Sequence, residues 1–381
     1  MSAMRSELVL PAFATAHSHA FQRGMRGAAQ RPLAPGDDFW SWRGQMYAAS
    51  TALTPESIYA VSRRAYRDLR EAGVMTVGEF HYVHHQADGT PYDDRTVLSD
   101  AVIQAARDEG LRIALLRAVY HRAGPGLQAE AGQRRFCDPS ADAALHDIDM
   151  LRARYAGAGD VRVGLAPHSV RAVPPAWWKE LADYARLHDM VLHSHVSEQP
   201  REVRECVEET GRLPVEFLAE SGVLGPRFVG VHCTQLSAGE VQLMGGGQSY
   251  ACICPTTERD LGDGLGPIAE LRAAGARVVW GIDSHVVCDP FEEMRSLETH
   301  ARLRDGTRVT FAPLQTTPAR ALWQEASVAT ARSIGFEDAG AELCFDLNAS
   351  FFEGVDPNLA VDALVFSGAA GRVPMTLRTA K

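Results

Sequence analysis

The chain has 381 residues, of which 46% are apolar and 23% are charged, a composition typical of globular proteins. Lysine and arginine number 38 against 48 aspartates and glutamates, and the resulting net charge of −10 argues against nucleic acid or an anionic membrane as the main partner. An acidic ligand would therefore need a local basic site.

Taken in chain order, apolar β-rich runs alternate with amphipathic segments that carry helix signals. Strands are predicted near residues 8–17, 74–80, 111–119, 161–167, 190–196, 228–234, 249–254 and 277–282. Helices are predicted between them near residues 54–72, 94–109, 140–155, 174–188, 201–220, 237–244, 267–274 and 290–304. The connections 20–53 and 80–95 are long, and long loops in compact domains are often functional.

Eight strand–helix repeats predict parallel strands with right-handed crossovers, and the simplest closed arrangement is an α/β barrel of the TIM type, (β/α)8. We expect this barrel over residues 1–335, with residues 315–335 helical. A doubly wound open sheet is the alternative, but no Gly-x-Gly-x-x-Gly or Walker-type loop follows an early strand. Residues 336–381 are expected to form a small β-rich tail with strands near 343–345 and 363–366.

The seven cysteines are scattered and include no Cys-x-x-Cys pair, which indicates reduced thiols in a cytoplasmic protein. No stretch reaches the roughly 18 apolar residues that a membrane span requires. Lys179 and Lys381 are the only lysines, so the chain offers almost no candidate for a modified lysine inside a barrel.

His17 and His19 follow the first predicted strand with one residue between them. Residues i and i+2 of an extended strand point to the same face, so the two imidazoles form a chelating pair, although such a pair alone is common by chance. In a TIM-type barrel the chemistry belongs at the carboxyl ends of the strands, and further ionisable residues occupy those positions. They are His168, His195, Glu198, His232 and Asp283.

Three imidazoles and a carboxylate suit Zn²⁺ or Fe²⁺, and such a site lowers the pKa of a bound water toward neutrality. We predict one divalent metal, with Zn²⁺ preferred. The predicted ligands are His17, His19, His195 and Asp283. His193 faces the same side as His195 and is the alternative ligand, although it would lie deeper in the barrel. A two-metal site usually needs a bridging carboxylate or modified lysine on a middle strand, which this chain does not offer.

Three residues are candidates for moving protons at this site: Glu198, His232 and Asp283. Glu198 lies three residues after His195, but a solvated carboxylate at a helix start is an about equally good interpretation. His232 could instead be a core histidine with satisfied hydrogen bonds. Asp283 could cap a helix or form an Asx turn.

Five stretches together make a far more specific pattern than the ligands alone. They are residues 17–23 (HSHAFQR), 39–43 (FWSWR), 79–85 (EFHYVHH), 166–173 (APHSVRAV) and 254–264 (CPTTERDLGDG). On these stretches the chain resembles the deaminase branch of the amidohydrolase superfamily of metal-dependent hydrolases, and within that branch the formimidoylglutamate deiminase family.

The resemblance implies hydrolysis of N-formimidoyl-L-glutamate to N-formyl-L-glutamate and ammonia, a step of histidine degradation. It also implies a substrate pocket formed by Gln22, Arg43, Tyr82, His168 and Arg171. Guanidinium groups grip carboxylates through paired, charge-assisted hydrogen bonds, and this substrate carries two carboxylates. Members of that family normally have a further N-terminal segment that contributes to a small β domain, so we expect a reduced or truncated β appendage here.

Two alternatives stay open. Another deaminase of the same branch, acting on guanine, cytosine or a related ring, would need amide and aromatic groups matched to a flat neutral base in place of Arg43 and Arg171. A catalytically inactive barrel kept for assembly would bind no metal. The partner that we expect is a small acidic metabolite, with no nucleic acid and no membrane, and a homodimer is expected.

Overall fold

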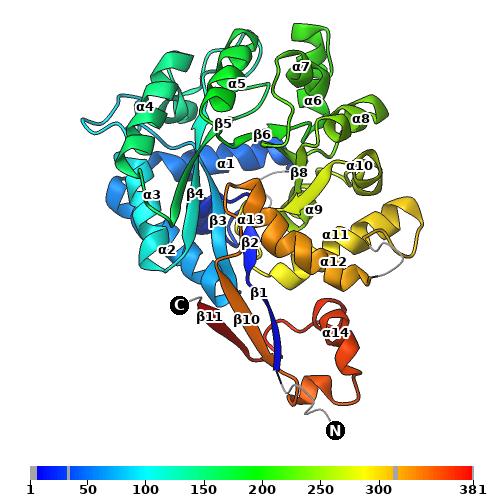
Figure 1. The fold of residues 1–381 in the computed structure, drawn as a ribbon. Helices are drawn as coiled ribbons and strands as arrows, with labels where there is room; N and C mark the ends of the chain where they lie inside the picture. Colours follow the sequence, from blue (N-terminus) through cyan, green and yellow to red (C-terminus); the bar gives the residue numbers. More distant parts are fainter. Residues whose placement is uncertain (1–6, 32–34, 312–315, 380–381) are drawn as a thin grey trace.

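The computed structural model describes residues 7–31, 35–311 and 316–379, and Figure 1 shows a barrel with a small sheet attached to it. Eight parallel strands form the barrel, each hydrogen-bonded to the next in chain order. They are β2 (Phe13–Thr15), β3 (Val74–His81), β4 (Arg112–Val119), β5 (Val161–Pro167), β6 (Leu192–Val196), β7 (Phe228–His232), β8 (Tyr250–Ile253) and β9 (Arg277–Trp280). The predicted TIM-type fold is confirmed.

Backbone contacts between the first and last strands bring the barrel close to full closure. The N–H of Ala16 donates to the carbonyl of Trp280 at 2.9 Å, and the N–H of Asp283 donates to the carbonyl of His17 at 3.0 Å. The N–H of His19 in turn donates to the carbonyl of Asp283 at 2.9 Å. These bonds hold the carboxyl end of β2 against the segment after β9, so residues far apart in the sequence share one rim.

The barrel strands are almost fully buried, because helices cover the outside and side chains fill the interior. All eight residues of β3 and all five of β6 are buried. Directly after β9, a Cβ on Gly281 would lie 2.7 Å from Cβ of His17 and 2.9 Å from Sγ of Cys254. Glycine at this position therefore leaves the room that His17 needs.

Helices surround the barrel (Figure 1). They are α2 (Pro55–Glu71), α3 (Val97–Asp108), α4 (Ala141–Arg154), α5 (Trp178–Leu187), α6 (Pro200–Thr210), α7 (Pro214–Glu220), α8 (Ala238–Gly246), α9 (Pro255–Leu261), α10 (Ile268–Ala274), α11 (Pro290–Asp305), α12 (Pro318–Gln324) and α13 (Thr330–Ser333). Short 3-10 helices lie in the connections: η1 (Ala20–Met25), η2 (Ala131–Phe136), η3 (Pro175–Trp177), η5 (Ser350–Phe352) and η6 (Pro357–Leu359). A π-helical turn, η4 (Glu325–Ala329), joins α12 to α13.

Local sequence explains where these helices begin and end. The predicted start of α2 is confirmed, since Oγ1 of Thr54 accepts a hydrogen bond from the N–H of Ser57 at 3.2 Å. The predicted helix over residues 201–220 is divided into α6 and α7. Gly211 ends α6 with a φ of 70°, a left-handed conformation that glycine adopts without strain.

One helix, α1 (Phe39–Thr51), occupies the long connection between β2 and α2, where no helix was predicted. Asp38 caps it, because Oδ1 accepts hydrogen bonds from the N–H groups of Trp40 at 3.0 Å and Ser41 at 3.1 Å. The helix supplies several side chains to the cavity at the carboxyl ends of the barrel strands, among them Arg43. It therefore belongs to the functional part of the fold.

The predicted appendage exists as a three-stranded antiparallel sheet, with β10 between β1 and β11. Its strands are β1 (Glu7–Pro11), β10 (Ala341–Asp346) and β11 (Met375–Thr379). Leu8 lies opposite Phe345, and Phe345 lies opposite Met375. The strand predicted near residues 343–345 is thus confirmed, and the N-terminal and C-terminal ends of the described chain meet in one sheet (Figure 1).

One predicted strand is divided in two, and another is wrong. Residues 8–17 form two strands, β1 and β2, because the chain leaves the small sheet and enters the barrel at Ala12. Residues 363–366 lie in helix α14 (Ala360–Phe366), whose buried positions 360, 361, 364 and 365 follow a helical spacing. Within the described part of the chain, no helix is long and apolar enough to cross a membrane.

Candidate active site

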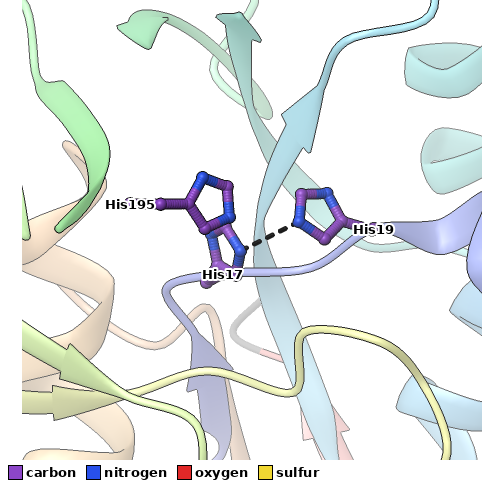
Figure 2. Close-up of side chains that lie close together, drawn as sticks. All are labelled: His17, His19 and His195. Carbon is purple, nitrogen blue, oxygen red and sulfur yellow. Dashed lines mark hydrogen bonds between the residues drawn. The ribbon is translucent and has the colours of Figure 1, made fainter. Parts of the chain in front are cut away.

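The two histidines after β2 and one at the end of β6 point their rings toward one another (Figure 2). Nε2 of His17 and Nε2 of His19 lie 3.1 Å apart, and a ring nitrogen of His195 lies within 4.8 Å of both. The rings of His17 and His19 stand nearly perpendicular, at 83°. The structure therefore brings together three of the four predicted ligands, all of them buried.

Asp283 brings a carboxylate to the same point. Its Oδ1 lies 3.3 Å from Nε2 of His17 and 3.3 Å from Nε2 of His19. Two ligands held about 2.1 Å from one zinc ion at tetrahedral angles lie about 3.4 Å apart, so these separations fit a single ion. Asp283 has a φ of 53°, an uncommon conformation for a residue with a side chain, and the backbone bonds that close the barrel hold it there.

Two of the imidazoles, those of His19 and His195, are prepared to coordinate through Nε2. Nδ1 of His19 is 2.8 Å from the carbonyl of Phe80, and Nδ1 of His195 is 3.0 Å from the carbonyl of His168. A ring that donates through Nδ1 keeps a lone pair on Nε2, which is the usual arrangement of metal-binding histidines. Burial and the charge of His17 lower the pKa of His19 to about 3, so its ring is neutral at pH 7, as metal binding requires.

The alternative ligand, His193, is not part of this cluster. Neither of its ring nitrogens has a hydrogen-bond partner in the part of the chain that the structure describes, and both are buried. His195, and not His193, groups with His17 and His19. The donor set of three neutral imidazoles and one carboxylate fits a divalent metal such as zinc.

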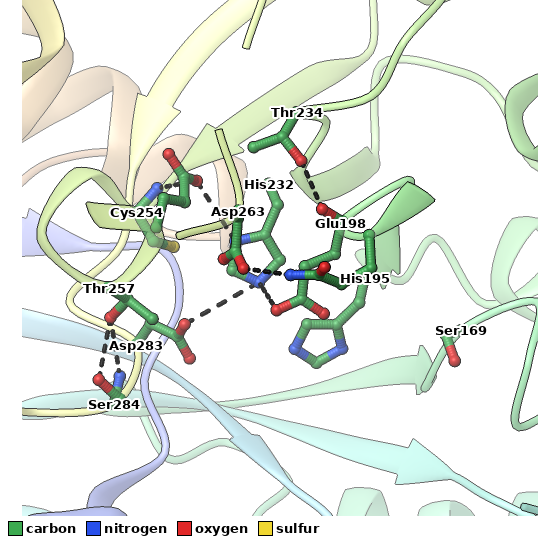
Figure 3. Close-up of polar contacts among 12 residues, drawn as sticks. Ser169, His195, Glu198, His232, Thr234, Cys254, Thr257, Asp263, Asp283 and Ser284 are labelled. Carbon is green, nitrogen blue, oxygen red and sulfur yellow. Dashed lines mark hydrogen bonds and ion pairs between the residues drawn. The ribbon is translucent and has the colours of Figure 1, made fainter. Parts of the chain in front are cut away.

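The candidates for proton transfer, Glu198, His232 and Asp283, lie close to one another and to His195 (Figure 3). Nε2 of His232 is 3.6 Å from Oε1 of Glu198 and 3.9 Å from Oδ2 of Asp283. Burial, the main cause, raises the pKa of Glu198 to about 7, although the charges of His232 and Arg171 lower it. A carboxyl group that titrates near neutrality can both accept and donate a proton under physiological conditions.

All five residues expected in the substrate pocket line one cavity together with His19, His195, Glu198 and Asp283. They are Gln22, Arg43, Tyr82, His168 and Arg171. The Nε2 of Gln22 donates to the hydroxyl of Tyr82 at 2.9 Å, and Nδ1 of His168 is 3.1 Å from Oγ of Ser169. The structure thus places the whole predicted set around one point.

Two buried arginine nitrogens in this cavity have no hydrogen-bond partner among the described residues. Nη1 of Arg43 and Nε of Arg171 make no hydrogen bond with any described residue, and the same holds for Oε1 of Gln22. Buried polar groups are nearly always paired in folded proteins, and an unpaired charged donor is especially costly. The cavity is therefore built to receive an anionic group from outside the chain.

The residues of this site all lie within a region that matches a known protein family. The model of the family described as "Amidohydrolase family" matches residues 8–342. The chain belongs to the amidohydrolase family.

Two curated relatives and one solved structure of a similar protein are informative. The formimidoylglutamate deiminase of Pseudomonas aeruginosa is 38% identical over 356 residues, which cover 92% of this chain and 78% of the relative. The 8-oxoguanine deaminase of the same organism is 30% identical, covering 96% of this chain and 80% of the relative. A crystal structure of an amidohydrolase from Brucella melitensis superposes with a TM-score of 0.89 at 34% identity, covering 96% of this chain and 82% of that one.

These relatives are hydrolytic deaminases and an amidohydrolase, so this amidohydrolase is a hydrolase that acts on carbon–nitrogen bonds by metal-dependent deamination. The ligand cluster indicates a divalent metal without specifying which one. The cluster of His17, His19, His195 and Asp283 supplies suitable ligands for a divalent ion.

The sequence analysis of this amidohydrolase missed three residues that orient the site. Oε1 of Glu258 lies 3.3 Å from Nδ1 of His232 and fixes that ring. Oε2 of Glu79 accepts a hydrogen bond at 2.6 Å from Ser18, which stands between the two histidines after β2. Trp40 stacks on Arg43 and Arg171, with ring-to-Cζ distances of 4.6 Å and 5.6 Å. All three lie in the stretches that carry the family resemblance, which was the available signal.

Proposed function

We propose that the enzyme hydrolyses N-formimidoyl-L-glutamate to N-formyl-L-glutamate and ammonia, as a step of histidine degradation. The observation that carries this proposal is a pair of incompletely paired arginines, the half-buried Arg43 and the buried Arg171, in a cavity that also contains three of the candidate metal ligands. The 38% identity to a curated formimidoylglutamate deiminase supports the same substrate.

The charges in the cavity match the charges of this substrate. Its two carboxylates would pair with the guanidinium groups of Arg43 and Arg171, which have free donors. Its formimino group is a basic amidine that is positively charged at neutral pH. Glu198 and Asp283 line the same cavity and provide the negative charge that such a group prefers.

We propose that His17, His19, His195 and Asp283 hold one divalent metal, with zinc preferred over iron. When bound there, such a metal polarises the reacting centre and lowers the pKa of water. The chain's own residues then handle the protons. Glu198 accepts a proton as water adds to the formimino carbon and donates it to the departing nitrogen. His232 and Asp283 assist this transfer, and their Nε2 and Oδ2 atoms lie 3.9 Å apart.

The reaction consumes only the substrate and one water molecule. Water adds across the C=NH bond to give a tetrahedral carbon, which collapses to a formyl group as ammonia leaves. Arg43 and Arg171 hold the glutamate part in place throughout, so the bond to the departing nitrogen is the one that faces Glu198.

A nucleobase deaminase is the second candidate, because an 8-oxoguanine deaminase is 30% identical over most of this chain. The cavity does contain aromatic walls, among them Tyr47, Tyr120 and Phe136, on which a flat ring could pack. A neutral base would nevertheless leave the free donors of Arg43 and Arg171 unpaired, which costs binding energy.

An ammonia-release assay with the metal-loaded enzyme tests the proposal. N-formimidoyl-L-glutamate, N-formimidoyl-L-aspartate, guanine, 8-oxoguanine and cytosine are compared at equal concentration. The highest kcat/KM on formimidoylglutamate supports the proposal, and the highest value on a nucleobase overturns it. Elemental analysis of the same sample distinguishes an inactive structural barrel, which would contain no stoichiometric metal. The homodimer, the absence of a nucleic-acid partner and the cytoplasmic location stay predictions.

A further inference from the structure

Several buried carboxylates surround His232, next to the three ligand histidines. They are Glu198, Glu258, Asp263 and Asp283, and each is at most 5% exposed. The nearby guanidinium of Arg171 is already bonded to Glu202 at 3.2 Å. Several buried carboxylates around one imidazole are costly unless protons or a cation balance their charge.

Three of these side chains have the geometry of a cation site. Single ligand atoms from Glu198, His232 and Asp263 all lie within 4.8 Å of one another. The separation of 3.6 Å between Nε2 of His232 and Oε1 of Glu198 is close to that of two ligands about 2.1 Å from the same ion. Figure 3 shows the carboxylates of Glu198 and Asp263 next to the His232 ring.

Asp263 supplies an independent sign that a partner is missing. Its side chain is only 3% exposed, and the structure describes no hydrogen-bond partner for Oδ2. The other oxygen, Oδ1, accepts a hydrogen bond from Nε2 of Gln199. The carboxylate is therefore held in place by one oxygen, and the other remains a buried acceptor without a donor.

His232 is held in the manner of a metal ligand. Its Nδ1 lies 3.3 Å from Oε1 of Glu258, whose same oxygen accepts the N–H of Cys254 at 2.7 Å. A carboxylate that fixes one imidazole nitrogen and leaves the other toward a cluster of ligand atoms is the usual outer partner of a coordinating histidine. Nε2 of His232 is left facing Glu198 and Asp283.

We propose that Glu198, His232 and Asp263 form a second cation site, at which an excess divalent ion binds and inhibits the enzyme. One nitrogen and two carboxylate oxygens suit Zn²⁺ or Co²⁺. Occupation of this site removes Glu198 and His232 from proton transfer. The inhibition rests on the proposed function, whereas the binding of the ion does not.

Cobalt titration of the full chain tests the proposal. The protein is stripped of metal, and bound Co²⁺ is measured by equilibrium dialysis as free Co²⁺ increases, together with the visible spectrum of the bound ion. Ammonia release from formimidoylglutamate is followed on the same samples. The variant is Asp263→Asn, which keeps an oxygen for Gln199, and the matched control is Asp260→Asn, an exposed position three residues earlier.

The wild-type chain and Asp260→Asn should bind a second, weaker equivalent of Co²⁺ with its own spectral change, and activity should fall over the same range. Asp263→Asn should bind that equivalent at least about tenfold more weakly, keep the uninhibited activity, and resist inhibition. Saturation of the wild type at one equivalent, or equal second-site affinity in Asp263→Asn, overturns the proposal. Glu198→Gln, read by dialysis alone, should also lose the second equivalent, so the site is tested even if Asp263→Asn misfolds or formimidoylglutamate is not the substrate.

Discussion

Oε2 of Glu202 lies 3.2 Å from Nη1 of Arg171, and both side chains are buried. The other oxygen of Glu202 accepts the N–H of Ser197 at 2.8 Å, directly before Glu198. Glu202 thus ties the substrate-binding arginine to the segment that carries the proposed proton carrier. Because it binds only one nitrogen of the guanidinium, Nε of Arg171 stays available to a ligand.

Replacement of Arg171 by alanine should remove a charge-assisted contact with a substrate carboxylate and leave Glu202 unpaired. We expect kcat/KM for formimidoylglutamate to fall by roughly 30-fold to 5,000-fold, equivalent to about 2–5 kcal/mol. Steady-state kinetics on the purified variant measure this. Arg204→Ala, an exposed arginine of α6, is the control and should change little. An Arg171→Ala enzyme with a nearly normal kcat/KM would remove the case for carboxylate recognition.

Glu198→Gln should keep the shape of the side chain but lose its ability to exchange a proton. We expect kcat to fall by about 10²-fold to 10⁴-fold while the one equivalent of metal at His17, His19, His195 and Asp283 stays bound. Single-turnover rates and elemental analysis of the same sample separate the two effects. Glu208→Gln, exposed on α6, serves as the control. A loss of this first equivalent in parallel with activity would instead indicate that Glu198 is a ligand of the metal held by the three histidines.

The activity should decline on the acidic side of neutrality. Burial raises the pKa of Glu198 to about 7, and the residue must be ionised to accept the proton from water. Below that pH it is protonated, so kcat/KM should fall tenfold for each unit of pH below about 6.5. A pH profile of kcat/KM with metal content checked at each pH measures this. An acidic limb near the ordinary pKa of a glutamate would be inconsistent with burial as the controlling factor.

The sequence predicted the barrel and its rim well because both leave local signals. Each barrel strand is a short apolar run, and His17, His195 and Asp283 stand at the end of such runs or just after them. The break at Ala12 leaves no such signal, since the chain changes sheets without an interruption of the apolar run. Residues 363–366 were ambiguous for a related reason, because four apolar residues in a row fit a strand or a buried helix.

The residues that the sequence analysis missed depend on tertiary packing. Asp263 comes near Glu198 only because the segment after β8 folds over the end of β6. Trp40 meets Arg171 only because α1 forms in a connection that no periodic pattern marks. Asp38 before an aromatic run was a capping signal for α1, and it could have been recognised.

Stability should depend on a buried ion cluster on β4. The guanidinium of Arg117 is 1% exposed and bonds Asp138 at 2.6 Å and Asp147 at 2.8 Å. Arg117→Met would leave two buried carboxylates without this partner, so the free energy of unfolding should drop by about 3–5 kcal/mol.

Urea unfolding measures this difference. The control is Arg107→Ala, which removes a solvent-exposed pair with Asp160 and should cost less than about 1 kcal/mol. If the two variants unfold alike, the buried cluster does not contribute as its burial suggests.

The most direct measurement of the proposed reaction is product analysis in ¹⁸O-labelled water. Incubation of the metal-loaded enzyme with N-formimidoyl-L-glutamate should give ammonia and N-formyl-L-glutamate in equal amounts, with the label in the formyl oxygen. Formation of formamide and glutamate, or no turnover by enzyme that contains its metal, would contradict the proposed attack at the formimino carbon with loss of the terminal nitrogen.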